Sequence, residues 1–230
     1  MATVLPPIGR NGIVNSVRKL SGNIITGWRD VASAANFIAG YIATLDSDGN
    51  ASVADDSSTQ ILGIFFCHKT TSFYRPVVDE SITFTGSAST VSLANANLQS
   101  GSIRVTDSAG SAYTITTDFT VNTTNGTITH AGGGSSIGAT ETVLVDYRYQ
   151  DPNLAGLDQT LGSGRASIIE GSGEIATLVY ETNAAWAINA DVAVSANGLP
   201  TVGGGGAVIG FVTKVPTSSD PELQFQMRMV

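Results

Sequence analysis

The sequence predicts an all-β protein in which a duplicated β unit is interrupted by a second β unit. Thr and Val favour strands, Gly and Ser favour turns, and all four are abundant in the 230 residues. Two apolar runs, residues 60–66 and 207–212, each carry one glycine near the middle and follow a polar or glycine-rich loop. Between them, residues 81–149 alternate apolar with polar side chains, which is the period of half-buried strands. With 42% hydrophobic and 13% charged residues, the chain can build a core.

Residues 1–29 are expected to form an extended N-terminal arm. Turn-forming residues interrupt this segment too often for a helix; they are Pro6, Pro7, Gly9, Asn11, Gly12, Ser21 and Gly22. Its apolar residues follow no sustained period. An arm of this kind usually needs another surface to order it.

The arm is basic and the rest of the chain is acidic. Arg10, Arg18, Lys19 and Arg29 give residues 1–29 a charge of +4, and the remaining residues carry −12. One interpretation is that the arm docks on an acidic surface, which includes its own neighbours. The other is that four charges keep a terminus soluble. For Trp28, packing in the core or at an interface is the first expectation.

Residues 30–80 and 165–230 are expected to form one discontinuous domain, because the same pattern occurs in both. Each half has a strand, a turn, a short strand and a glycine-containing apolar strand, in that order. In the first half these elements are residues 37–45, 48–49, 51–54 and 61–64, and in the second half they are residues 187–194, 197–198, 199–202 and 208–211. A last strand, residues 222–230, alternates strictly. Gly63 and Gly210 each predict a bulge or a close approach of two backbones in a packed strand.

Residues 81–150 have a different pattern of apolar and polar residues and are expected to fold as an inserted domain. Segments around 81–85, 102–106, 119–121, 127–129 and 142–149 alternate apolar with polar residues, and hairpin-type turns lie at 107–110 and 124–126. About seven short strands in roughly 70 residues are typical of a small antiparallel sandwich. Residues 151–164, with Pro152 and three glycines, are expected to be a linker.

The residue pattern predicts no catalytic, cofactor or metal site. The two histidines are His68 and His130, and the single cysteine, Cys67, should point away from His68 because neighbours in a strand face opposite sides. No metal-ligand spacing is present. Asp107 and Asp118 keep a carboxylate-dependent glycan hydrolase open as a minor alternative. No run is apolar enough to span a membrane, and aromatic residues do not interleave with basic ones as in nucleic-acid binders.

Both halves of the discontinuous domain resemble the capsid decoration (cement) proteins of tailed bacteriophages. The resemblance is carried by Glu174–Tyr180, Ile188–Val194, Asn197–Val202, Val208–Val212 and Glu222–Met229, and in the first half by Phe37–Phe66. Residues 91–149 are similar to the Ig-like modules of phage structural proteins. The long insert and the basic arm depart from the pattern of the family.

The resemblance implies a small β-barrel or β-tulip-like domain, with an inserted Ig-like β-sandwich, on the outer surface of a phage capsid. It further implies a homotrimer that clamps adjacent major capsid protein subunits, with Arg10, Arg18, Lys19, Trp28 and Arg29 as contact residues. Under this hypothesis a chain without residues 1–29 still folds but no longer binds heads. The alternative is a phage fibre or adhesin whose Ig-like domain recognises a host surface or glycan.

Overall fold

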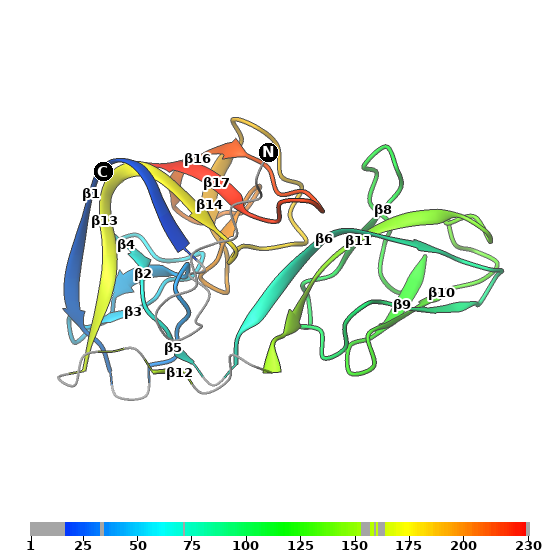
Figure 1. Ribbon diagram of the computed structural model, residues 1–230, viewed down its shortest axis with the longest axis horizontal. Coiled ribbons are helices and arrows are strands. Elements are labelled where there is room, and N and C mark those ends of the chain that lie inside the picture. Colours follow the sequence, from blue (N-terminus) through cyan, green and yellow to red (C-terminus); the bar gives the residue numbers. More distant parts are fainter. Residues whose placement is uncertain are drawn as a thin grey trace.

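A computed structural model describes residues 17–32, 35–70, 72–152, 157–158, 160 and 164–228. Within these ranges the chain forms strands and no helix, which confirms the predicted all-β class. The strands fall into a main domain and an insert, which Figure 1 shows side by side.

The main domain is built on one curled sheet of nine strands. Its order is β15–β14–β16–β17–β13–β4–β2–β3, and β1 pairs with β13. The strands are β1 (Val17–Asp30), β2 (Ile42–Leu45), β3 (Ala51–Val53), β4 (Ile61–Phe65), β13 (Arg165–Thr177), β14 (Asp191–Val194), β15 (Pro200–Thr201), β16 (Val208–Lys214) and β17 (Leu223–Met227). One edge of β13 pairs with β1, and the other pairs with β4 and then β17. Because Val31 bridges to Ala51 in β3, the first half of the sheet curls towards closure, giving a barrel-like domain.

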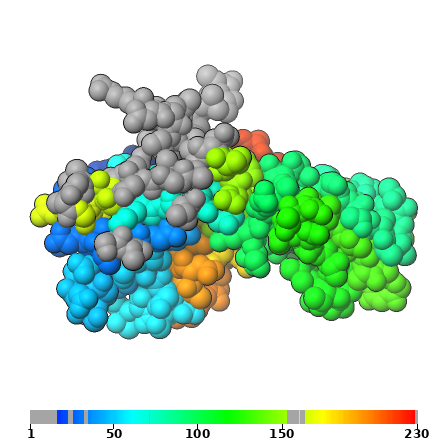
Figure 2. Space-filling model, turned by 90° about the horizontal axis from the view of Figure 1, so that it is seen from below, coloured from blue at the N-terminus to red at the C-terminus, as the bar shows by residue number. Residues whose placement is uncertain are grey.

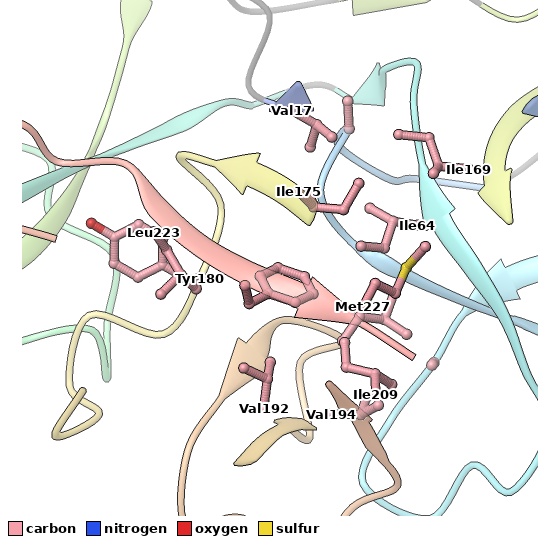
Figure 3. Close-up of a cluster of buried hydrophobic side chains, with 14 of the residues drawn as sticks. Val17, Ile64, Ile169, Ile175, Tyr180, Val192, Val194, Ile209, Leu223 and Met227 are labelled. Atoms are coloured by element: carbon pink, nitrogen blue, oxygen red, sulfur yellow. The ribbon is translucent and has the colours of Figure 1, made fainter. Parts of the chain in front are cut away.

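The core of the main domain lies where the two halves of this sheet meet. Figure 3 shows Val17 from β1, Ile64 from β4, Ile175 from β13 and Met227 from β17 converging there. Ile64, Ile175 and Met227 are 0–1% exposed. The predicted alternation of the last strand is confirmed over Leu223–Met227, because Leu223, Phe225 and Met227 are buried and the residues between them are half-buried. Met229, expected to face inward as well, lies outside the described residues.

The two halves of the main domain repeat the same hydrogen bonds. In the first copy the Phe65 amide donates to the Tyr41 carbonyl over 2.9 Å, and in the second Val212 donates to Ala190 over 2.9 Å. β2 pairs with β3 and β4, just as β14 pairs with β15 and β16. The predicted duplication is therefore confirmed at the level of the backbone.

The turns of the two copies also correspond. Asp46 Oδ1 accepts from the amides of Asp48 and Asn50 over 3.0 and 2.8 Å. In the second copy Ser195 Oγ accepts from the amides of Asn197 and Leu199, over 3.2 and 3.1 Å. Asp46 therefore acts as a turn-forming residue that stabilises the loop locally.

Gly63 and Gly210 lie beside equivalent β-bulges, as predicted. The pairing of β2 with β4 shifts register after Ala43, opposite Gly63, and that of β14 with β16 shifts after Val192, opposite Gly210. A Cβ atom on Gly63 would lie 2.0 Å from the Ile169 carbonyl oxygen, and one on Gly210 would lie 2.1 Å from that of Gln226. Both glycines are needed because the neighbouring strand approaches too closely for a side chain.

The insert is a two-sheet antiparallel sandwich. One sheet has the order β6–β11–β8 and the other β7–β10–β9. The strands are β6 (Tyr74–Thr83), β7 (Thr90–Ser92), β8 (Arg104–Thr106), β9 (Phe119–Asn122), β10 (Thr127–His130) and β11 (Thr142–Gln150). A separate buried cluster lies between the sheets and includes Phe84, Phe119, Ile128, Val143 and Tyr147.

Two predicted segment boundaries fall inside elements of the structure. The insert was expected to begin at residue 81, but β6 runs unbroken from Tyr74 to Thr83 along β11. The expected linker of residues 151–164 contains the short strand β12 (Leu157–Asp158), which pairs with β5 (Lys69–Thr70). In both places, pairing with a distant strand decides where the element lies.

A buried polar junction joins the insert to the main domain. Arg148 of β11 is 3% exposed, and its Nη2 donates to Glu181 Oε2 over 3.4 Å. The other carboxylate oxygen of Glu181 accepts from Ser195 Oγ and Asn197 Nδ2. Thr182 Oγ1 donates to the Ser102 carbonyl over 2.5 Å. Figure 2 shows the insert extending from one side of the main domain.

Candidate docking surface

β1 has an outer edge that no strand of the described chain covers. It is 14 residues long and pairs with β13 alone. Among the described residues, the amide and carbonyl groups that point away from β13 pair with no further strand, as at the edge of a sheet. Figure 1 shows β1 at the margin of the main domain.

The second half of the expected arm is thus a strand of the sheet. Its turn-forming pair, Ser21 and Gly22, lies next to a register shift between Lys19 and Ser21. Gly22 has φ +94°, and a Cβ atom there would lie 2.5 Å from the Cα atom of Gly173. The residues that predicted an irregular arm therefore allow β1 to bend closely over β13.

Much of β1 is exposed to solvent. Val17 is 2% exposed, whereas Leu20 is 38% and Trp28 is 47% exposed. Ser167 lies opposite Trp28, and its carbonyl accepts a hydrogen bond from the Phe66 amide over 2.8 Å. β13 and β4 pair Ile168 with Phe65, and Phe66 follows directly after β4. Phe66 is 41% exposed, so one exposed aromatic residue adjoins Ser167 on each side of β13, while Ser167 itself is only 5% exposed.

Two of the four basic residues of the arm meet acidic groups of their own chain. Arg18 Nε donates to Glu222 Oε1 over 3.0 Å, and its Nη2 contacts the second carboxylate oxygen. This hydrogen bonding raises the pKa of Arg18. Arg29 Nε donates to Glu170 Oε1 over 3.0 Å. The acidic surface on which these arginines dock is provided by β13 and by the residue before β17.

The remaining predicted contact residues are Lys19, Trp28 and Arg10. Lys19 is exposed on β1, and Trp28 lies on the same strand nine positions further along. Arg10 lies outside the described residues. β1 thus brings four of the five predicted contact residues onto one strand. Phe66 was not predicted as their neighbour, because only the pairing of β4 with β13 brings it there.

Both histidines are buried and hydrogen-bonded to the backbone. His68 Nδ1 accepts from the Ala39 amide over 3.2 Å, and burial lowers the pKa of His68 to about 4. His130 Nδ1 accepts from the Gly132 amide over 2.8 Å, so its Nε2 donates to the Ile137 carbonyl. Cys67 Sγ accepts from the Ser167 amide, and the His68 ring packs edge-on against Phe73. These contacts give each ring a packing role.

The two carboxylates considered for hydrolysis stabilise loops of the insert. Asp107 Oδ1 accepts from the amides of Ser111 and Ala109, and Asp118 accepts from those of Thr114 and Ser136. These backbone hydrogen bonds lower the pKa of both aspartates. A general acid of a glycosidase needs a raised pKa. Neither carboxylate has that property.

None of the described residues form a group of three or more His, Cys, Asp or Glu side chains that could hold a metal ion. They also contain no helix with the length and hydropathy of a membrane span.

Comparison of the chain with protein-family models and with curated proteins finds no match.

Proposed function

We propose that this chain is a structural virion protein that decorates and stabilises the outside of a phage capsid. In this proposal it binds as a homotrimer and clamps adjacent major capsid protein subunits. The observation that supports it best is the outer edge of β1, which no strand of the described residues covers, with Trp28 in β1 and Phe66 just after β4 both exposed. The duplicated barrel-like domain agrees with the family that the sequence resembles.

The surface has the chemistry for adding a strand from a partner. A strand edge recognises any extended segment through its backbone groups, and neighbouring side chains supply selectivity. Trp28 and Phe66 supply the large apolar contacts that often dominate binding energy. On a capsid, several weak contacts of this kind act together because the binding surface repeats.

Because Arg18 and Arg29 are held by Glu222 and Glu170, their main contribution is to fix β1 in place. They present the edge and Trp28 in one defined position, and this lowers the entropy lost on binding. In the proposal, the direct contacts therefore come from the edge and the aromatic pair.

Binding to heads that lack the protein tests this proposal. The double variant Trp28→Ala/Phe66→Ala should bind at least about tenfold more weakly in cosedimentation, because each truncation removes a large buried contact. Ile115→Ala is the matched control, since Ile115 is similarly exposed, at 43%, but lies on the insert. Equal binding by the double variant and the unchanged chain would remove β1 and its aromatic pair from the interface.

A further inference from the structure

A cleft lies between the insert and the main domain, apart from the β1 surface. Its volume is about 160 Å³, roughly that of five water molecules. The insert contributes Asp79, Arg104 and Asp146, and the main domain contributes Thr182 and Trp186. Clefts at domain junctions that combine an apolar surface with a few polar groups are common ligand sites.

Two carboxylates and one guanidinium meet in this cleft. Asp146 Oδ1 accepts from the Asp79 amide over 2.8 Å, and Arg104 Nη1 approaches Asp146 Oδ2 at 3.5 Å. Arg104 Nη2 also donates to the Gly110 carbonyl over 3.2 Å, and within the described ranges the other N–H groups of the guanidinium have no partner. The half-buried Asp79 carboxylate makes no hydrogen bond or ion pair with the part of the chain that the structure describes.

The negative charge of Asp146 is only partly balanced by the positive charge of Arg104. Burial raises its pKa, and the attraction of Arg104 does not cancel this effect. Its side chain is 13% exposed, so water replaces little of the missing interaction. The acceptor in the cleft that the described residues leave without a hydrogen bond is therefore the Asp79 carboxylate, because each oxygen of Asp146 already accepts one.

Trp186 gives the cleft an apolar wall. Its Nε1 donates to the Glu181 carbonyl over 3.0 Å, and its ring meets Tyr180 edge to face. Since the polar atom is already bonded, the ring offers only apolar contact to a ligand.

The mixture of charges disfavours a charged ligand. Arg104 would repel a cation, and Asp79 and Asp146 would repel an anion. A hydroxyl group can donate to a carboxylate and accept from a guanidinium at the same time. From this combination and the Trp186 wall, we propose that the cleft binds a neutral pyranose ring through its hydroxyl groups and one C–H face.

This assignment differs from glycan recognition by the insert alone. The carboxylates come from the insert, but Trp186 comes from the main domain. The full chain is therefore required for binding. Binding of a sugar in this cleft does not require attachment to a capsid.

Titration of the full chain with methyl pyranosides tests the proposal. The probes are the methyl α-glycosides of glucose, mannose and galactose, each to high millimolar concentration, because so small a ligand binds weakly. In a Trp28→Phe background, where Trp186 is the remaining tryptophan, at least one glycoside should change the fluorescence in a saturable way. Asp79→Asn should weaken that binding about tenfold or more. The exposed turn residue Asp48 supplies the matched control, Asp48→Asn, which should bind as before.

A second measurement keeps the test independent of variant stability. In amide NMR spectra of the unchanged chain, the glycoside should shift Asp79, Thr182 and Trp186 first. Saturable binding with these shifts supports the site. Three results would overturn the proposal: no glycoside binds, the shifts lie elsewhere, or lysine methyl ester or acetate binds in the cleft instead.

Discussion

Gly63 and Gly210 occupy equivalent positions in the two copies, and each leaves room for a carbonyl oxygen of the neighbouring strand. Their importance could be inferred from the sequence because each interrupts an otherwise apolar run. The oxygen atoms that they face could not be inferred, since Ile169 belongs to a strand far along the chain from Gly63 and the register of β17, which carries Gln226, against β16 is set by the fold. At the scale of single residues, close backbone packing explains these positions without any ligand.

Replacing either glycine by alanine should destabilise the protein. Gly63→Ala or Gly210→Ala places a methyl group about 2 Å from a backbone oxygen, and relieving that overlap should cost about 2–3 kcal/mol. Gly86→Ala is the control, because open space surrounds that position, and it should stay within about 0.5 kcal/mol. Urea unfolding gives the three free energies, and similar values for all of them would contradict the packing explanation.

His68 should make the stability depend on pH below neutrality. Its folded pKa of about 4 lies below the ordinary value of 6.5. Between these values the unfolded chain binds the additional proton, so the free energy of unfolding falls as the pH drops from about 6.5 to 4. The loss should reach about 3 kcal/mol.

The His68→Gln variant isolates this effect. Glutamine can still accept a hydrogen bond from the Ala39 amide but does not titrate. Unfolding curves measured between pH 4 and 7 should therefore be flatter for the variant. An unchanged pH dependence would show that other groups cause it.

At the scale of elements, the described part of the predicted N-terminal arm is a strand of the main sheet, β1. The sequence predicted an arm because glycine and proline interrupt residues 1–29 and no period is visible. The structure places residues 17–30 against β13 along its whole length. This pairing joins residues roughly 150 positions apart, and local periodicity carries no information about which distant strand has a free edge.

The expectation that a chain without residues 1–29 still folds is consequently revised. That deletion removes Val17 from the core and exposes the paired edge of β13. The lost burial and the unpaired backbone groups should together cost more than about 3 kcal/mol. Deletion of residues 1–16 retains β1 and is the matched control. Circular dichroism melting should show a larger loss for the first deletion than for the second, and equal melting would contradict the role of β1.

At the scale of the whole molecule, the sequence predicted the class, the duplication and the existence of the insert. These features are visible in short stretches of the sequence, such as the Asp48–Gly49 and Asn197–Gly198 turns and the alternation of residues 142–149. The start of the insert was not predicted, because β6 contains Pro76 and is bulged where Asp79 has φ +54°, which breaks its alternation. The aromatic pair and the cleft also depend on contacts between distant segments.

The central claim is that the protein binds the outside of a phage capsid through the edge of β1. Electron cryomicroscopy of heads carrying the protein tests it most directly, since the β1 edge and the insert lie on different parts of the molecule (Figures 1 and 2). We expect density on the outer surface, with β1 against a strand of the capsid subunit and Trp28 and Phe66 buried at the contact. Heads that bind no protein, or a complex in which β1 faces solvent, would contradict the claim.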